Sequence, residues 1–471
     1  MFAVLVGCYG TEPNPVAFCD LDSACIDPRF PYCDIDGTIG GAPGRCMAVD
    51  CTPMVFEVCT GDVALVCNAT GDSYDRTPCA GGCNATDGCR SFCVAGMAQS
   101  CTNDTLVTCN AEGTATVAET CALGCASDSP RCLTFDPSNG LRAALDTAAA
   151  EPPITLLSGT QIDTSAGTVN DVMGNPVPLT SMRIQQADGS EIFALVGERF
   201  TIHNTNVTGA SAVAFVADGP IEIRGLVTAR AAMGVGGPGA GACSGGDQDQ
   251  FMGAVCPTLV STGAGGGGNA EAGGHGGSRS LNAGAPLTTF TPLRGGCRGG
   301  HQRDPLNQIV AFGGGGGGAV QLVSATKVGF VDTGQIDVGG GGGRSTAGGG
   351  AGGLIIIEAP TVSFGGLGTG VFANGGSGGG CGLSGVDSGP NTTPAPGRVC
   401  ANYFSGDGGT ATRSPGSGCS TNCSAATCPI VYGGGGGSVG RMRIVTRDGT
   451  FGTSGTPLFS VKMSTGQLVA K

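Results

Sequence analysis

The feature that most constrains the fold is a cysteine repeat in the first third of the chain. Six cysteines are separated by 8, 8, 12, 4 and 6 positions, and a second set begins 42 residues later with separations of 8, 8, 12, 4 and 7. The first set is Cys51, Cys59, Cys67, Cys79, Cys83 and Cys89, and the second is Cys93, Cys101, Cys109, Cys121, Cys125 and Cys132. A module of about 40 residues buries too little apolar surface to offset its chain entropy. The repeat therefore predicts modules stabilised by disulfides, each contributing roughly 2–4 kcal/mol.

The other cysteines extend this argument. Residues 19–50 form a shorter module with Cys19, Cys25, Cys33 and Cys46, and the second half of the chain holds Cys243, Cys256, Cys297, Cys381, Cys400, Cys419, Cys423 and Cys428. Together with the repeats at 51–92 and 93–132 they make 24 cysteines, an even number that predicts a disulfide framework in an oxidising, extracellular compartment. Zinc binding is the alternative, although residues 19–132 contain no His and no Cys-x-x-Cys pair.

The remaining cysteine, Cys8, ends the run Leu5-Val6-Gly7-Cys8, which resembles a bacterial lipobox. We expect Cys8 to be lipidated and to anchor the chain to a membrane; a disulfide to another cysteine is the alternative. Residues 1–8 would then be a residual signal sequence. Because residues 1–7 are too few for a complete signal peptide, we expect the true translation start to lie upstream. Tyr9 is not the Asp that favours inner-membrane retention, so the outer-membrane surface is predicted.

Asp34 and Asp36 are candidate calcium ligands. They lie in Asp34-Ile35-Asp36-Gly37, which is a fragment of a calcium-binding loop. The remaining ligand positions of a complete loop, including the bidentate acid at its end, are missing. Solvated turn residues are therefore the alternative interpretation, and no other cofactor is expected.

The charge distribution argues against nucleic acid as a partner. The formal net charge is -13, and residues 1–133 alone hold 16 acidic residues against 5 Arg. Binding to phosphate backbones, or to anionic lipid through a polybasic segment, needs clustered Lys and Arg, and no such run is present. No stretch of 18 or more apolar residues predicts a membrane-spanning helix.

The chain changes character after residue 132. Residues 133–153 predict a short helix ended by Pro152-Pro153, or a flexible linker. From 154 to 471 short alternating strands follow, about three in every 20–25 residues. That spacing predicts a mainly β, parallel β-helix-like domain, in which coils bury their inward residues by stacking; a β-sandwich is the alternative. The expected strands are residues 192–196, 200–203, 212–216, 221–224, 319–323, 328–331, 335–338, 354–358, 362–364, 370–373, 441–445 and 449–451.

Glycine-rich excursions interrupt these strands at about residues 234–317, 339–352 and 375–437. Such tracts are often flexible loops, but polyglycine also forms extended threefold helices that pack side by side. We favour the ordered form because each tract runs directly into a strand. The first excursion has three cysteines and the third has five. Since neither odd set can pair internally, full oxidation predicts a disulfide between the two excursions, which would then emerge on the same side of the domain.

No catalytic motif is recognisable. His203, His275 and His301 are the three histidines, and the sequence contains no His-Glu-x-x-His, no phosphate loop and no Gly-x-Ser-x-Gly elbow on a strand-turn-helix. Parallel β-helices often carry polysaccharide-cleaving sites made of carboxylates, Arg and Lys, and the candidates here are Asp218, Glu222, Arg224, Asp337 and Glu358. Ordinary solvated groups on outward faces are equally expected at these positions, so no enzyme is predicted.

The Leu-Val-Gly-Cys start, the 42-residue cysteine repeats and the glycine run from Gly433 to Gly437 resemble glycine-rich surface lipoproteins of myxobacteria and related soil or predatory bacteria. The resemblance covers most of the chain and implies a location and an architecture, but no catalytic residue. We predict a secreted, lipid-anchored surface protein with a structural or adhesive role, whose partners are a membrane and polysaccharide or other surface proteins. A polysaccharide-degrading enzyme and a subunit of an extracellular fibre are the alternatives.

Overall fold

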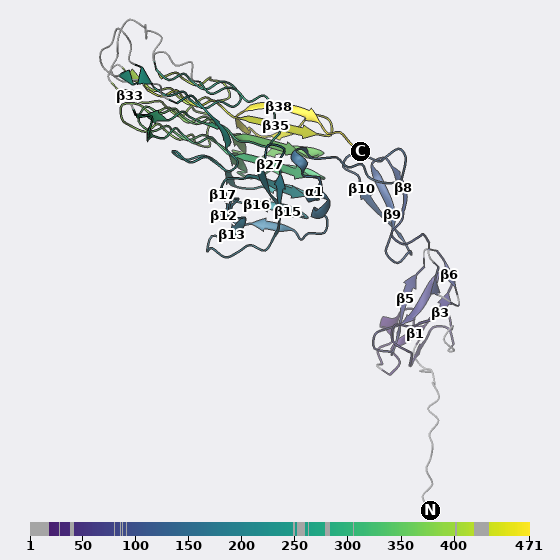
Figure 1. Cartoon of the computed structure of the whole chain (residues 1–471). Coiled ribbons are helices and arrows are strands. Elements are labelled where there is room, and N and C mark those ends of the chain that lie inside the picture. Colours follow the sequence, from purple (N-terminus) through teal and green to yellow (C-terminus); the bar gives the residue numbers. More distant parts are fainter. Residues whose placement is uncertain are drawn as a thin grey trace, which may run out of the picture. The chain divides into compact units, whose positions relative to one another are not determined.

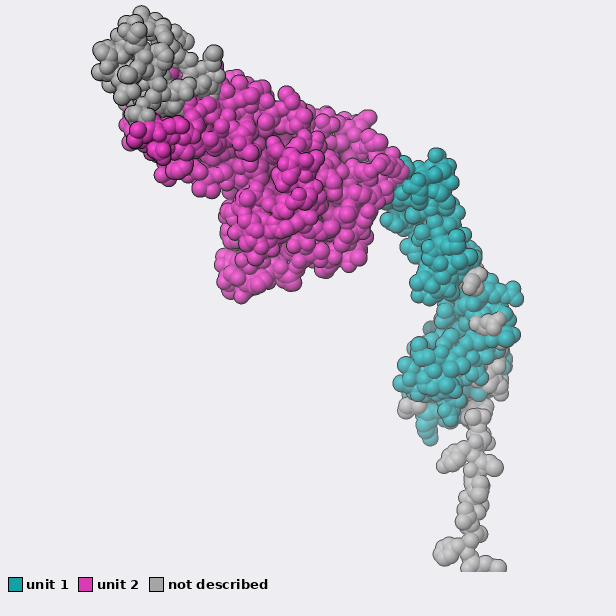
Figure 2. Space-filling view, in the orientation of Figure 1, with its two compact units in different colours: residues 1–133 teal, residues 134–471 magenta. Residues whose placement is uncertain are grey.

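The computed structural model describes residues 18–27, 29–37, 42–79, 81–84, 86, 88–90, 92–247, 250–251, 260–261, 263–277, 283–304, 306–400, 403–418 and 433–471. The chain divides into two compact units, Met1–Leu133 and Thr134–Lys471 (Figure 2), and each is described by itself. The described residues are mainly β (Figure 1), with a disulfide-rich first unit and large parallel sheets in the second. These three predictions are confirmed.

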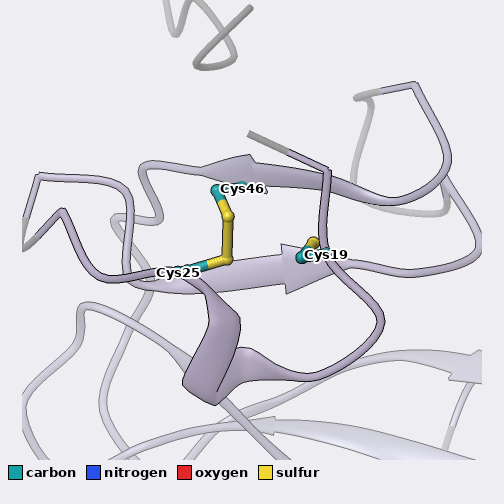
Figure 3. Close-up of side chains that lie close together, drawn as sticks. All are labelled: Cys19, Cys25 and Cys46. Carbon is teal, nitrogen blue, oxygen red and sulfur yellow. A yellow bond between two sulfur atoms is a disulfide. The ribbon is translucent and has the colours of Figure 1, made fainter. Parts of the chain in front are cut away.

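The first module of unit 1 is a small antiparallel sheet held by two disulfides. The short 3-10 helix η1 (Asp22–Ala24) precedes β1 (Tyr32–Asp34) and β2 (Arg45–Met47). The bridges are Cys19–Cys33 and Cys25–Cys46, and Figure 3 shows the second of them. Cys33 lies directly opposite Cys46 in the sheet. Each strand of the sheet is therefore tied by one disulfide to the segment that precedes β1.

The two cysteine repeats have the same fold and the same connectivity. The first contains β3 (Phe56–Thr60), β4 (Val63–Cys67), β5 (Tyr74–Pro78), β6 (Cys83–Asn84) and β7 (Gly88–Cys89), and the second contains β8 (Ala98–Thr102), β9 (Thr105–Cys109) and β10 (Thr116–Thr120). The disulfides are Cys51–Cys67, Cys59–Cys83 and Cys79–Cys89, then Cys93–Cys109, Cys101–Cys125 and Cys121–Cys132. In both copies the first cysteine pairs with the third, the second with the fifth and the fourth with the sixth.

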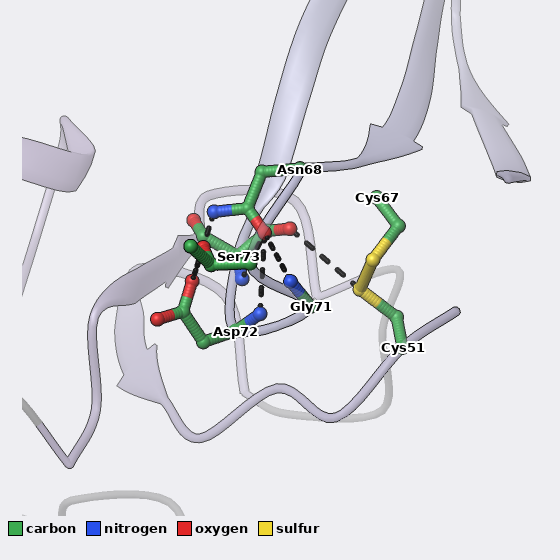
Figure 4. Close-up of a disulfide and its surroundings, with 7 residues drawn as sticks. Cys51, Cys67, Asn68, Gly71, Asp72 and Ser73 are labelled. Atoms are coloured by element: carbon green, nitrogen blue, oxygen red, sulfur yellow. Dashed lines mark hydrogen bonds between the residues drawn. A yellow bond between two sulfur atoms is a disulfide. The ribbon is translucent and has the colours of Figure 1, made fainter. Parts of the chain in front are cut away.

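An asparagine closes the same loop in both repeats. Asn68 Oδ1 accepts hydrogen bonds from the backbone N–H of Gly71 at 2.8 Å and of Asp72 at 3.2 Å, beside the Cys51–Cys67 bridge (Figure 4). Asn110, 42 residues later, accepts from the Thr114 N–H at 2.9 Å. Such side-chain bonds substitute for backbone partners in a turn. The asparagine that follows the third cysteine of each repeat is therefore structural.

The first module and the first repeat share one small core. The rings of Tyr32 and Tyr74 meet edge to face with centroids 5.1 Å apart, and both pack with buried Leu65. Arg76 of β5 also donates a hydrogen bond to the Cys33 carbonyl at 2.7 Å. The boundary near residue 50 therefore separates two cysteine patterns, but the two modules pack together around one shared core.

Unit 2 is built on three sheets. The first sheet contains β11 (Ile154–Leu156), β16 (Phe200–Ile202), β19 (Ile221–Ile223), β28 (Lys327–Phe330), β31 (Thr361–Gly365) and β36 (Gly452–Ser454). The second contains β13 (Thr168–Asn170), β12 (Thr160–Asp163), β17 (Thr205–Thr208), β20 (Leu226–Thr228), β29 (Gln335–Asp337), β32 (Gly370–Phe372) and β37 (Leu458–Ser460). The third contains β14 (Thr180–Gln185), β15 (Glu191–Gly197), β18 (Ala212–Ala217), β27 (Ala319–Ser324), β30 (Leu354–Glu358), β35 (Arg441–Thr446) and β38 (Lys462–Gln467).

The chain visits these sheets in a fixed rotation. β15, β16 and β17 belong to the third, first and second sheets, and β18, β19 and β20 repeat that order one strand further along each sheet. Neighbouring strands are parallel, except that β13 and β14 run antiparallel to β12 and β15 at one end. Because side chains alternate between faces, an inward residue of one turn lies beside an inward residue of the next.

Those inward residues form one continuous core. Val213 lies beside Val320, which lies beside Ile355, and all three are fully buried. In the first sheet Phe330 stacks on Phe364 with ring centroids 4.3 Å apart. A strand of this kind buries its apolar face only through its neighbours, which explains why the alternating pattern recurs at regular intervals.

A short helix covers part of the outer face of the third sheet. The helix α1 (Arg142–Ala148) contacts β15 and β18 and buries Ala144, Leu145 and Ala148. The outward positions beneath it, Ala194 and Ala214, are small, so the helix can approach the strands closely. Of the two interpretations of residues 133–153, the structure contains the helix.

All three glycine-rich excursions of unit 2 begin and end at the same corner, where the second sheet meets the third. They connect β20 to β27, β29 to β30 and β32 to β35, so each follows a strand of the second sheet and precedes a strand of the third. They include the short strands β21 (Gly241–Ser244), β22 (Gln250–Phe251), β23 (Val260–Ser261), β24 (Cys297–Arg298), β25 (Gln302–Arg303), β26 (Ile309–Ala311), β33 (Val399–Cys400) and β34 (Tyr403–Phe404). Figure 1 shows their traces running side by side from the sheets toward β33.

Glycines from different excursions hydrogen-bond to one another through their backbones. The Gly267 N–H donates to the Gly349 carbonyl at 2.9 Å, and the Gly349 N–H donates to the Gly435 carbonyl at 2.9 Å. A Cβ built on Gly350 would lie 1.9 Å from the Gly315 oxygen. Glycine is therefore needed here because the backbones lie too close together for any Cβ. We call the packed glycine segments of the three excursions the glycine layer.

The cysteines of the excursions are described only in part. Cys243 pairs with Cys297 inside the first excursion, and Cys381 of the third is also disulfide-bonded. The predicted bridge between the excursions rests on cysteines whose side chains lie outside the described residues, namely Cys256, Cys400, Cys419, Cys423 and Cys428. The backbone hydrogen bonds nevertheless place the excursions on the same side of the sheets.

Eight described strands of the three sheets have no counterpart among the expected ranges, namely β11, β12, β13, β14, β17, β20, β37 and β38. β17 and β20 are short and carry Thr and Asn, so they show little apolar alternation. The four strands expected between 192 and 224 lie in two successive turns, with β15 and β16 in one and β18 and β19 in the next. At the C-terminal end, β36 begins at Gly452 rather than within the expected 449–451, and His203 follows β16 instead of lying in it.

Candidate functional site

A pocket of about 380 Å³ lies on the outer face of the third sheet. Its floor is formed by Ile356 and Glu358 of β30 and by Arg443 and Val445 of β35. Its walls come from three other segments of unit 2, around residues 136–138, 290–291 and 467–469. The helix α1 covers the outer face of β15 and β18. β30 and β35, which pair further along the same sheet, carry larger outward side chains, and α1 does not cover them.

Glu358 is held at the base of this pocket. Both of its carboxylate oxygens accept the Ser138 backbone N–H, at 3.2 and 3.0 Å, and Oε2 also accepts from Gln321 Nε2 at 2.7 Å. Burial raises the pKa of the Glu358 carboxyl above its usual value, while these hydrogen bonds and the charge of Arg443 oppose the rise. The carboxylate therefore fastens the segment at 138 to β27 and β30.

Asp136 lies at the rim in a different electrostatic setting. It forms ion pairs with Lys471 and, at 3.7 Å, with Arg142. The hydrogen bond from Lys471 holds the pKa of Asp136 below its usual value. Two carboxyl groups of one pocket are thus shifted in opposite directions, as acid–base catalysis requires, although both are engaged by partners within the fold.

Two arginines on β35 frame the pocket. Arg441 is buried and donates to Asn269 Oδ1 at 2.8 Å, to the Leu287 carbonyl at 2.8 Å and to the Thr289 carbonyl at 2.7 Å. Arg443 follows two residues later on the same face, and both guanidinium groups lie over the ring of Phe290, at 4.9 and 5.2 Å from its centroid. Arg441 thereby fixes the wall that carries Phe290.

The five residues considered for polysaccharide cleavage do not converge. Glu222 and Arg224 lie on or beside β19 of the first sheet, where they pair at 2.7 Å and remain partly exposed. Asp218 follows β18, and the partial loss of solvent around its carboxyl, together with the negative charge of Glu198, raises its pKa. Asp337 ends β29 in the second sheet and Glu358 ends β30 in the third. These residues are spread over three sheets, and in the described part of the chain Glu222 and Arg224 are the only two of the five that an ion pair joins.

The expectation of solvated outward positions holds for the Glu222–Arg224 pair and fails for two acids. Asp337 is 1 % exposed and Glu358 is 6 % exposed. Burial raises the pKa of Asp337 to about 6, against a hydrogen bond from the Gly339 N–H. Its Oδ2 has no hydrogen-bond partner among the described residues. Alternation along a strand predicts a face but not the later segments that cover it.

The histidines do not form a site either. His301 is buried beside Phe312, and its Nδ1 accepts the Gly313 N–H at 3.0 Å, which is a structural use of the ring. His203 is half-buried beside the first sheet, and His275 lies in the glycine layer with interactions of its own. The described residues bring no two of these three rings together.

The candidate metal ligands have structural surroundings. Asp34 is buried on β1 and Asp36 is exposed, and no group of three acidic ligands includes them in the described ranges. Cys19, Cys25 and Cys46 have sulfurs within 4.8 Å of one another (Figure 3), but all three are in disulfides. Cys8 lies outside the described residues.

Sequence reasoning missed most of the pocket. It selected Glu358 but not Asp136, Ser138, Phe290 or Arg443. The alternation Arg441-Met442-Arg443-Ile444 does indicate two arginines on one outward face, and Phe290 is a rare aromatic within a glycine-rich tract. Neither signal shows that the segments meet.

Comparison with family models, with curated proteins and with solved structures found no match to this chain. Among the residues that the structure describes, no helix has the length and apolar character needed to span a membrane. The nine described disulfides indicate an oxidising environment.

Proposed function

We propose that this chain is a secreted, lipid-anchored cell-surface protein with a structural or adhesive role that contacts polysaccharide, matrix or other cells. The observation that carries the proposal is the glycine layer, in which backbones pack at distances that exclude any Cβ. Such a layer offers rigidity and very little side-chain chemistry, which suits a scaffold better than a catalyst. The outer-membrane surface, with Cys8 as the lipid-bearing residue, is part of the same proposal.

The architecture we propose for unit 2 is a parallel β-helix with polyglycine excursions. The rotation of the chain through three parallel sheets supports the first part. Backbone hydrogen bonds between extended glycine segments support the second. A crystal structure of unit 2 would test this architecture, because it gives the backbone angles of the glycine segments directly. Angles away from those of the extended threefold helix would contradict it.

Two experiments test the proposed role. Incorporation of a labelled fatty acid into the protein expressed from its own gene, with Cys8→Ala as the matched variant, tests the anchor; label that persists in Cys8→Ala would contradict it. A glycan array followed by sizing of each bound polysaccharide tests the role itself. We expect binding without shortening of the polymer, and shortening would instead support a polysaccharide-degrading enzyme.

A fibre subunit is the second candidate, and one feature favours it. β36, β37 and β38 end their sheets, and their outer edges pair with no strand in the described part of unit 2. Open edges of this kind accept further strands. Electron microscopy of the purified protein distinguishes the two roles, because a fibre subunit would form filaments whose length grows with concentration.

A further inference from the structure

Arg443 is the one strongly polar group of the pocket whose hydrogen-bonding capacity is unused in the described part of the chain. Its guanidinium lies over Phe290, 5.2 Å from the ring centroid, and donates no hydrogen bond to any described residue. Arg441, two positions earlier on the same face, has acceptors for its Nε and for both terminal nitrogens. The same residue type is thus fully hydrogen-bonded at one position and has no hydrogen bond to a described residue two positions later.

The carboxylates of the pocket do not satisfy Arg443. Glu358 is committed to the Ser138 N–H and to Gln321, and the charge of Arg443 acts on it with no hydrogen bond or ion pair between the two in the described part of unit 2. Asp136 is committed to Lys471 and Arg142. A half-buried guanidinium whose donors have no partner among the described residues calls for an external acceptor. Its planar fork matches a carboxylate in two parallel hydrogen bonds.

The cavity also suits more than a bare anion. Its volume of about 380 Å³ falls within the range of small-molecule sites, which is roughly 300–1,000 Å³. Thr291 lines it together with the apolar residues Ile356 and Val469. Apolar walls with a few polar groups, and a cation fixed by an aromatic ring, are features of a site prepared for a specific ligand.

We propose that this pocket binds an acidic sugar residue of a polysaccharide, with the Arg443 guanidinium donating two parallel hydrogen bonds to the sugar carboxylate. The inference rests on the proposed contact with polysaccharide and specifies its chemistry. Phe290 keeps the guanidinium in place without consuming a donor. Arg441 positions Phe290 through the carbonyl groups of residues 287 and 289.

Calorimetric titration of the full chain with a hexuronate oligosaccharide and with its carboxyl-reduced counterpart tests the inference. We expect the acidic form to bind at least about 10-fold more tightly, since one charged hydrogen-bonded contact is worth about a factor of 10 to 100. Arg443→Gln should abolish that preference. Arg443→Lys, which keeps the charge and loses the fork, should retain part of it.

The matched control is Arg199→Gln, which removes the same charge from an exposed residue paired with Glu198 at 2.7 Å. Unfolding midpoints of all variants establish that each is folded. Equal binding of both oligosaccharides, or an Arg443→Gln protein that retains the preference, would overturn the inference while leaving the proposed polysaccharide contact standing. Failure of the unaltered protein to bind any glycan on the array would remove the proposed contact and the inference together.

Discussion

Replacing Gly350 with Ala should destabilise unit 2 strongly, although the change adds one methyl group. Its Cβ would lie 1.9 Å from the Gly315 oxygen and 2.5 Å from the carbon of the same carbonyl. Both atoms belong to the backbone, so the clash cannot be relieved by rotating a side chain. One segment must move by more than about 1 Å before the contact becomes an ordinary one.

The magnitude follows from what that movement disrupts. The Gly350 N–H donates to the Gly341 carbonyl at 2.8 Å, and the Gly350 carbonyl accepts from the Gly376 N–H at 2.9 Å. Overpacking costs about 1–3 kcal/mol, and two weakened hydrogen bonds add about 1 kcal/mol each. The lower entropy of Ala in the unfolded chain returns roughly 0.4–1 kcal/mol. We therefore expect a net loss of about 2–4 kcal/mol.

Denaturant unfolding followed by far-ultraviolet circular dichroism, with disulfides intact, measures this loss. Gly452→Ala is the control, because that glycine is exposed on β36 and its nearest heavy atoms would lie 3.9 Å from the new Cβ. The control should change stability by no more than about 0.5–1 kcal/mol, in the stabilising direction. Equal effects of the two substitutions would refute the close packing of the glycine layer.

Three further predictions concern the same unit. Removing the Cys243–Cys297 bridge as C243S/C297S, across a separation of 54 residues, should lower the free energy of unfolding by about 4 kcal/mol in the chain-entropy model; an unchanged midpoint would contradict it. The pKa of Asp337 is raised to about 6 in the folded protein, so folding favours its protonated form. The free energy of unfolding is therefore highest below the unfolded pKa near 4 and falls as pH rises through 6. Asp337→Asn should raise this free energy by up to about 3 kcal/mol at about pH 7.5 and change it little at about pH 3.5. Denaturation at both pH values checks the sign. Arg441→Gln should accelerate amide hydrogen exchange around Phe290 while leaving β15 protected, and uniform exchange across both regions would contradict the positioning role.

The sequence predicts the repeating parts of this molecule well. Strands such as β15 and β18 carry unbroken apolar runs because both of their faces are covered, and these runs are visible without a structure. The cysteine repeat likewise predicts two equivalent modules, although its connectivity needed coordinates because six cysteines allow 15 pairings.

The pocket was beyond such reasoning for a physical reason. Asp136, Phe290 and Arg443 come from segments separated by more than 150 positions, and no local pattern states that they meet. The burial of Asp337 and Glu358 was missed likewise, since it depends on segments that pack over the strand ends. The periodicity of a strand shows on which face of the sheet a side chain lies. Its burial depends on whether a segment distant in the sequence packs over that face.

The shared corner of the three excursions sets an order of events during folding. The Gly435 N–H donates to the Ala264 carbonyl at 2.9 Å, so part of the glycine layer joins residues 171 positions apart. Turns of the sheets can add one after another as the chain becomes available. The Ala264 carbonyl, however, cannot form this hydrogen bond until the third excursion has been exported. Contacts at such separation form late. A chain exported from its N-terminus would thus assemble its sheets progressively and close the glycine layer only when export is nearly complete.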